Sequence, residues 1–258
     1  MMHWMNVVHG RRGLRLLTLV ACACALTALT SAAHADGTLE KVDAAVNNWK
    51  SLDFGYKLVT TQPGAATTTL KLRMRMRKKD GDNQQMIELF APADMKGTKI
   101  LTASPTQMYI YMPSFGKVRR IASHVTEQGF LGTALSQRDM TLTHYGKYYT
   151  STTTSDDSAK ATLKLTAKPD KNAPYPTIEM VIDKSIWLPT EIRYFSDKGT
   201  HIKTETRSDY SCRKGYCAPK VQVVTDRTTK TESTLYLKKL KVNPSIPDKV
   251  LAKRYLLR

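Results

Sequence analysis

The chain has 258 residues, of which 41% are hydrophobic, 24% charged and 8% aromatic. This is the composition of an ordinary globular protein, and it excludes a collagen-like fibre, a long disordered chain and a cysteine-stapled miniprotein. Forty Lys and Arg residues against 22 Asp and Glu residues give a formal charge of +18. Such a charge favours anionic partners: nucleic acid, a phospholipid surface or an acidic ligand.

The first 35 residues have the three parts of an export signal. A positive stretch over residues 11–15 precedes an apolar run over residues 16–29, and Ala33 and Ala35 are small residues in front of a cleavage site. This arrangement is typical of a secretory signal peptide. The apolar run is shorter than the roughly 20 residues that a membrane-spanning helix needs. We therefore predict cleavage after Ala35 and export to the periplasm.

An alternative start lies inside the same segment. Residues 19–22 (LVAC) resemble a lipobox, which would make Cys22 a lipidated N-terminus and anchor the protein to a membrane. Only six residues separate Arg15 from Cys22, and the apolar run continues past the cysteine. Cleavage after Ala35 is the better interpretation, and in the periplasm nucleic acid is excluded as a partner.

One helix is predicted at the start of the mature chain. Leu39, Val42, Val46 and Trp49 recur at helical spacing and predict an amphipathic helix over residues 38–50. Beyond this segment the helical periodicity almost disappears.

Residues 69–77 alternate strictly between apolar and basic side chains, which predicts a strand with one buried face. The apolar face carries Leu70, Leu72, Met74 and Met76, and the basic face carries Lys71, Arg73, Arg75 and Arg77. The basic face has two interpretations: it binds phosphate head groups, or it is a solvated outer face. We favour the solvated face.

Short runs of β-forming residues, separated by Gly, Pro, Asp or Asn, continue to the C-terminus. The further predicted strands cover residues 84–90, 99–103, 107–112, 117–121, 162–167, 177–183, 190–195, 201–207, 220–226 and 231–242. The polar stretch 150–158 (TSTTTSDDS) is predicted to be a loop. Strands at this spacing indicate one large antiparallel sheet in a single domain, residues 36–258.

Two cysteines, Cys212 and Cys217, remain after the predicted cleavage. An even pair in an exported chain predicts a disulfide, and Gly215 between them suits a tight hairpin turn. The spacing also fits half of a metal site, but no second Cys or His cluster completes one.

A search for catalytic chemistry gives no positive result. The sequence has no G-x-S-x-G, no H-E-x-x-H and no phosphate-binding glycine loop. His124, Ser136 and Asp139 would supply the residue types of a triad, but sequence order alone is no argument for that geometry. We expect no catalytic residue, no metal and no cofactor.

Several segments together resemble the bacterial outer-membrane lipoprotein-sorting protein family, the relatives of the periplasmic carrier LolA. They are residues 90–101 (FAPADMKGTKIL), 108–113 (MYIYMP), 117–121 (KVRRI), 129–133 (GFLGT), 139–140, 188–199 and 246–257. The resemblance implies a mainly β fold, a large curved antiparallel sheet that forms an unclosed half-barrel, with a few helices that cover its concave face. It also implies a cavity that shields lipid acyl chains.

The leading hypothesis is a non-enzymatic periplasmic carrier of lipid or lipoprotein acyl chains toward the outer membrane. Its partners would be a lipid or acylated lipoprotein and an inner-membrane transporter, with peripheral membrane contact. The alternative is an accessory docking subunit of a lipid-exporting envelope transporter, without cargo of its own. Because methionine adapts to irregular apolar partners, the Met-rich strand face is either ordinary core or the wall of an acyl cavity. The predicted lipid-binding residues are Met74, Met76, Phe90, Ile110, Met112, Phe130 and Leu131.

Overall fold

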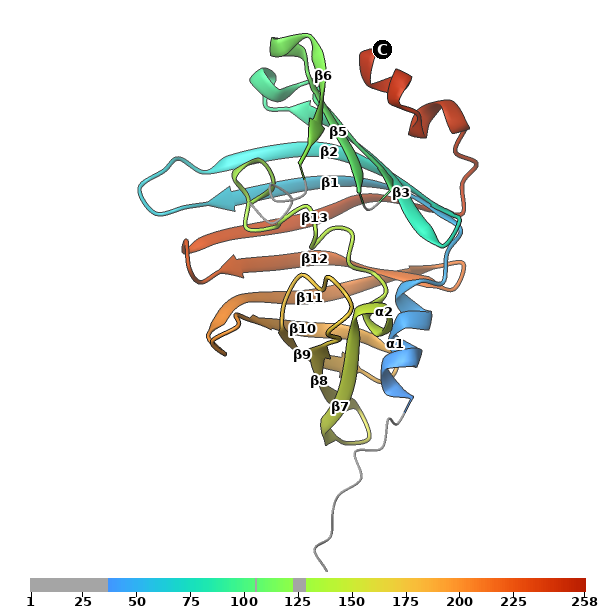
Figure 1. Ribbon diagram of the computed structural model, residues 1–258, viewed down its shortest axis with the longest axis vertical. Helices are drawn as coiled ribbons and strands as arrows, with labels where there is room; N and C mark the ends of the chain where they lie inside the picture. Colours follow the sequence, from blue (N-terminus) through green and yellow to red (C-terminus); the bar gives the residue numbers. More distant parts are fainter. Residues whose placement is uncertain (1–36, 105, 123–128) are drawn as a thin grey trace, which may run out of the picture. The chain divides into compact units, whose positions relative to one another are not determined.

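Antiparallel strands dominate the protein, whose computed structural model describes residues 37–104, 106–122 and 129–258 (Figure 1). The helices are α1 (Thr38–Val46) and α2 (Tyr145–Tyr148), with 3-10 turns η1 (Ala93–Met95), η2 (Pro113–Phe115), η4 (Phe130–Gly132), η5 (Asp248–Leu251) and η6 (Lys253–Leu257). The strands are β1 (Ser51–Thr61), β2 (Thr68–Lys79), β3 (Asp82–Ala91), β4 (Lys99–Ser104), β5 (Gln107–Met112), β6 (Lys117–Ile121), β7 (Tyr149–Asp156), β8 (Lys160–Ala167), β9 (Thr177–Asp183), β10 (Leu188–Phe195), β11 (His201–Arg213), β12 (Tyr216–Asp226) and β13 (Thr231–Val242). The predicted signal peptide and Cys22 lie outside the described residues.

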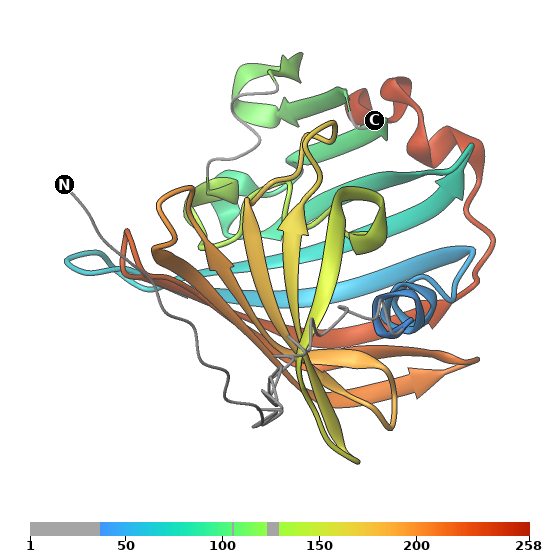
Figure 2. The same ribbon diagram turned by 60° about the horizontal axis from the view of Figure 1, so that its bottom comes forward.

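All thirteen strands of the described residues belong to one sheet, in the order β6-β5-β4-β3-β2-β1-β13-β12-β11-β10-β9-β8-β7. Two meanders, β1 to β6 and β7 to β13, are joined where β1 pairs with β13. The edge strands β6 and β7 do not pair, so the sheet curls without closing (Figure 2). This arrangement confirms the predicted fold class: mainly β, antiparallel and open.

The inner face of the sheet is set by the register of β1 and β2. Phe54 lies opposite Met74, and Leu52 lies opposite Met76, so the predicted apolar face of β2 continues onto β1. Directly opposed residues share a face. These four side chains belong to one buried cluster, which also includes Leu135 of the segment that connects β6 to β7. That connecting segment therefore covers part of the inner face.

The two helices cover the other half of the inner face. Leu39 and Val42 of α1 and Tyr145 of α2 are buried against side chains of β8, β9 and β10. Asp43 links the helices, because its carboxylate accepts hydrogen bonds from the backbone N–H groups of Tyr145 (2.8 Å) and Gly146 (2.7 Å). Burial raises the pKa of Asp43, although both N–H bonds oppose the rise.

The C-terminal segment covers the outer face at the other end of the sheet. Met86 lies opposite Arg75, and Leu101 lies opposite Met86, so all three point to the face away from Met74. Leu251 and Leu256 pack on Met86 and Leu101 in a separate cluster of fully buried side chains. The basic face of β2 is thus not simply solvated.

Three segments differ from the sequence prediction. The first helix ends at Val46 and not at residue 50, because the Asn47 side-chain amide bonds the carbonyls of Asp43 (2.8 Å) and Thr143 (2.7 Å). Strand β1 was not predicted. The predicted loop 150–158 is wrong, because β7 occupies most of it; its Ser and Thr side chains give no hydrophobic contrast between the two faces.

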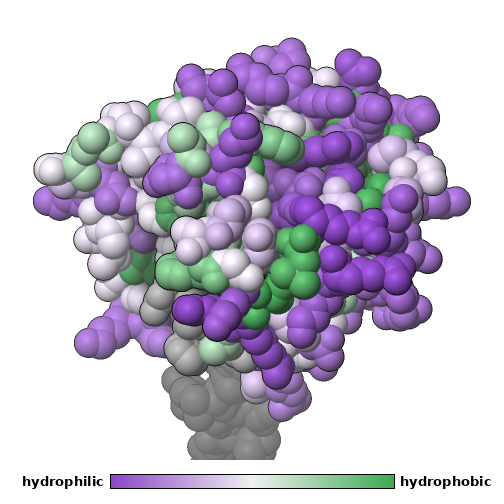
Figure 3. Space-filling model, turned by 90° about the horizontal axis from the view of Figure 1, so that it is seen from above, coloured by the Kyte–Doolittle hydropathy of each residue, from purple (hydrophilic) through white to green (hydrophobic). Residues whose placement is uncertain are grey.

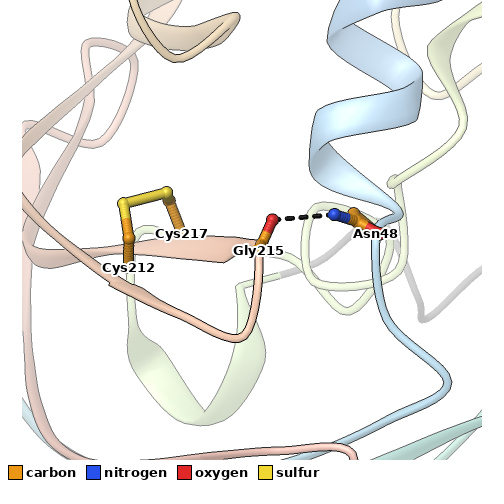
Figure 4. Close-up of a disulfide and its surroundings, with 4 residues drawn as sticks. All are labelled: Asn48, Cys212, Gly215 and Cys217. Carbon is orange, nitrogen blue, oxygen red and sulfur yellow. Dashed lines mark hydrogen bonds between the residues drawn. A yellow bond between two sulfur atoms is a disulfide. The ribbon is translucent and has the colours of Figure 1, made fainter.

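The predicted disulfide is confirmed. Cys212 and Cys217 are directly opposed on β11 and β12 and form a bond across the hairpin (Figure 4). Lys214 and Gly215 both have positive φ, at 50° and 77°, which is the backbone of a tight two-residue turn. The Asn48 side-chain amide donates to the Gly215 carbonyl (2.8 Å) and ties the turn to the segment after α1.

Replacing both Cys212 and Cys217 by Ser should destabilise the protein by about 2 kcal/mol, because the bond closes only a short loop in the unfolded chain. Urea unfolding of the oxidised protein and of the double variant measures this difference. Loss of the folded state in the variant would contradict the expectation.

Asp43→Ala should cost about 1–2 kcal/mol, since it leaves the N–H groups of Tyr145 and Gly146 without their acceptor. Asp43→Asn keeps one acceptor oxygen and should lose less. The comparison is made by thermal and urea unfolding, with Glu40→Ala on the exposed face of α1 as the control. A loss no larger than that of the control would show that Asp43 does not hold the two helices together.

Candidate functional site

A half-open cavity of about 150 Å³ lies on the inner face of the sheet. Its walls come from the end of α1, from β1, β2, β11, β12 and β13, and from the segment between β6 and α2. The lining residues are Val46, Trp49, Leu52, Phe54, Tyr56, Met74, Met76, Leu135, Asp139, Met140, Leu142, Thr143, Tyr145, Glu205, Arg207, Tyr216, Ala218, Pro219, Gln222 and Leu235.

One wall of the cavity is apolar. Leu52 and Phe54 of β1 and Met74 and Met76 of β2 are all buried, and Leu135 covers them from the connecting segment. The strict alternation of β2 makes this wall possible, since it turns both methionines away from the basic side chains. This wall can remove hydrocarbon from water.

The opposite wall is polar. Glu205 and Arg207, two residues apart on β11, both point inward and form an ion pair. The Tyr194 hydroxyl donates a second hydrogen bond to Glu205 at 2.9 Å. Because Glu205 is only 3% exposed, this carboxylate depends on these two partners for its solvation.

The tyrosines in and around the cavity remain protonated. Burial raises the pKa of Tyr216 to about 12, and the nearby Arg207 only partly opposes the rise. Burial also raises the pKa of Tyr56 and, together with the charge of Glu205, that of Tyr194. Burial alone would lower the pKa of Arg207, but Glu205 and the tyrosines outweigh it, so the guanidinium stays charged. The cavity therefore presents tyrosine hydroxyls and the ion pair of Glu205 and Arg207.

A second buried ion pair holds the connecting segment on the sheet. The Lys203 amine of β11 donates to Asp139 at 2.7 Å and to the Tyr175 hydroxyl at 2.8 Å. The Tyr175 hydroxyl donates to the other Asp139 oxygen at 2.6 Å, and the Ser136 backbone N–H donates to Asp139 at 2.7 Å. Asp139 and Ser136 thus belong to a hydrogen-bond network with Lys203 and Tyr175 that holds the segment in place. His124 lies outside the described residues.

The predicted lipid-binding residues are only partly brought together. Met74 and Met76 line the cavity. Phe130 is buried in the same inner cluster, and Leu131 and Ile110 pack against it half-buried, but none of the three lines this cavity. Met112 is half-buried at the end of β5, and Phe90 is 53% exposed beside a β-bulge.

Most residues of the cavity wall were not predicted from the sequence. Leu52, Phe54 and Tyr56 alternate with polar residues, so the signal for their strand was present and was not used. Glu205 and Arg207 alternate with threonines, and that pattern favours an outward charged face. Hydropathy does not predict that Glu205 and Arg207 are buried, because their burial depends on Tyr194 of β10 and on the ion pair between them.

The arginines of β2 have partners within the protein. Arg73 makes a two-pronged contact with Asp53 (2.8 and 2.7 Å), Arg75 pairs with Glu88 and bonds the Tyr255 hydroxyl, and Arg77 pairs with Asp248. Burial would raise the pKa of Asp53, but the hydrogen bonds and charge of Arg73 outweigh it and lower the pKa. These arginines stabilise the fold and tie down the C-terminal segment.

The described residues leave few large apolar side chains exposed. Seen from above, hydrophilic side chains prevail around a small apolar patch (Figure 3). Among the described residues, the large hydrophobic side chains that stay exposed are Phe90, Phe115 and Leu257. No described helix has the length and apolar character to span a membrane, and the described residues contain no cluster of three or more His, Cys, Asp or Glu suited to a metal ion.

Comparison with known proteins places the chain in a family. The model of a family described as "-like: Uncharacterized protein" matches residues 81–258, more than half of the chain. The chain belongs to this family. No curated protein matches the sequence.

Solved structures share the fold. A structure described as an outer membrane lipoprotein-sorting protein domain from Vibrio parahaemolyticus is 20% identical, with a TM-score of 0.76 over 86% of this chain and 97% of that one. A DUF1329 family protein from Desulfovibrio piger is 18% identical, with a TM-score of 0.75 over 86% and 98%. A LolA superfamily protein from Nitrosomonas europaea is 19% identical, with a TM-score of 0.69 over 86% and 98%. The resemblance to the LolA-like lipoprotein-sorting proteins is confirmed in the fold.

Lys203→Met should cost about 3–5 kcal/mol of unfolding free energy, because it leaves the Asp139 carboxylate buried without its cation. The double variant Lys203→Met, Asp139→Asn removes both charges and should lose less than the single variant. Urea unfolding of the two single variants and the double variant gives the coupling energy. Additive losses would show that the two residues do not stabilise each other.

Proposed function

We propose that the protein is a non-enzymatic periplasmic carrier, which shields the acyl chains of a lipid or lipoprotein on the way toward the outer membrane. The observation that carries the proposal is the half-open cavity on the inner face, with its apolar wall from β1 and β2. The shared fold supports it, since one structure with this fold is described as an outer membrane lipoprotein-sorting protein domain.

The physical reason for such a cavity is the cost of hydrated hydrocarbon. Each methylene moved out of water contributes about 0.8 kcal/mol, so a long acyl chain needs a cover to cross an aqueous compartment. The cavity of about 150 Å³ has the volume of only about five water molecules. It therefore takes the end of an acyl chain, and the rest of a long chain would lie outside it.

The remaining parts of the proposal concern location and partners. Export by the N-terminal signal, with cleavage after Ala35, would bring the protein to the periplasm, and a Cys22-anchored form is the alternative. The cargo would be a lipid or acylated lipoprotein, received from an inner-membrane transporter. A docking subunit without cargo would have the same fold, but its cavity would not need to bind anything.

Met74→Arg should weaken binding of a fluorescent fatty-acyl probe to the delipidated protein at least tenfold, because it places an unpaired charge in the apolar wall. Thr68→Arg is the matched control: it adds the same group to an exposed position of the same strand and should change affinity less than twofold.

Met140→Trp tests the cavity without a charge, in case Met74→Arg does not fold. The indole should fill part of the space and weaken probe binding about fourfold for each methylene it displaces. Wild-type protein that binds no probe, or binding that neither variant alters, would leave the docking subunit as the better explanation.

A further inference from the structure

The outer face of the three central strands carries lysines without acidic partners. Lys57 of β1 lies directly opposite Lys71 of β2, and both point away from the inner cluster. On β13, Lys239 and Lys241 are exposed on the same face, and a β-bulge adds the exposed Lys238 beside them. No ion pair involves any of the five within the part of the chain that the structure describes. We call these residues the outer lysine patch.

The two nearest acidic residues already form ion pairs with arginines. Asp53 lies opposite Lys241 of β13, but it is buried and both of its oxygens bond Arg73, and Glu88 is paired with Arg75. Glu232, on the same face of β13, lies at the far end of the strand, four residues before Tyr236. The charge that faces solvent over these three strands is therefore positive.

This arrangement is unfavourable for the isolated protein. Like charges directly opposite each other on neighbouring strands destabilise a sheet, and Lys57 and Lys71 are such a pair. Strands lie about 4.8 Å apart, and residues two positions apart on a strand are separated by about 7 Å, so the patch concentrates its charge within roughly 10 by 15 Å. Folding does not need this concentration, which points to a partner.

The type of cation indicates the type of partner. The arginines of β2 pair with carboxylates of the protein, whereas β1 and β13 contain no arginine and all their cations are lysines. Arginine suits two-pronged recognition of a single phosphate, while lysine acts as a point charge toward a diffuse anionic surface. Tyr236 lies among the lysines, with the Lys238 amine 5.4 Å from its ring centre. An amphipathic ring beside lysines is typical of a membrane interface.

We propose that the outer lysine patch docks the protein on a membrane surface that contains anionic phospholipids. The bilayer supplies the negative charge that the patch lacks, and each lysine near such a surface contributes about 1 kcal/mol, or about fivefold in affinity. This docking is a property of the outer face. It does not depend on whether the inner cavity holds a lipid.

The test is co-sedimentation of the purified protein with vesicles of phosphatidylethanolamine and phosphatidylglycerol, at about 50 mM salt. We expect binding that decreases as salt rises and that is absent with phosphatidylcholine vesicles. The double variant Lys57→Gln, Lys71→Gln should bind about 25-fold more weakly. Its thermal stability should be unchanged or higher, because the substitution removes a repulsive pair.

A control of equal charge change is Lys171→Gln, Lys198→Gln, two exposed lysines in the turns before β9 and before β11. It should weaken vesicle binding less than twofold. Equal losses in both double variants, equal binding to neutral vesicles, or retention on heparin without vesicle binding would each overturn the proposal. The acyl-probe assay is run on the same variants, and we expect no change there, which separates this proposal from the carrier function.

Discussion

The pairing of β1 with β13 is the contact on which the rest of the structure depends. It joins the two meanders, β1 to β6 and β7 to β13, edge to edge into one sheet. Its register also decides which side chains are inside, because a shift by one residue would turn every side chain to the other face. With Leu58 opposite Leu235 and Phe54 opposite Leu240, the apolar faces of both meanders become one inner surface.

The sequence predicts a strand or helix correctly where the structure of that segment is determined by its own residues. Strand β2 was predicted because its two faces differ along its whole length, and the hairpin disulfide because turn and cysteines are local. Strand β7 shows almost no difference between its faces, so the sheet and not the sequence pattern identifies it. The predicted helix ended early because Thr143, nearly a hundred residues away, bonds the side chain of Asn47.

The same distinction explains the site. Met74 and Met76 could be assigned to an apolar wall from alternation alone, and they do line the cavity. Glu205 and Arg207 could not, since charged side chains are buried only when the fold supplies partners, here each other and Tyr194. Phe90 was expected to help line or close the cavity, but it is the extra residue of a β-bulge and stays half exposed. Local alternation thus predicts which face an apolar side chain takes, but the burial of a charged side chain depends on partners that are distant in the sequence.

The opposite faces of β1 and β2 show how a single pair of strands can serve two purposes. Inside, Leu52, Phe54 and Met74 exclude water, while outside Arg73 and Asp53 satisfy each other and leave the neighbouring lysines unpaired. The two faces are separated only by the thickness of the backbone, so their chemistry must be kept apart by strict alternation. This constraint explains why arginines and methionines alternate so regularly over residues 73–76, and why a substitution there can be assigned in advance to one face. An altered residue at an even position would act on the inner cavity, and one at an odd position on the outer ion pairs.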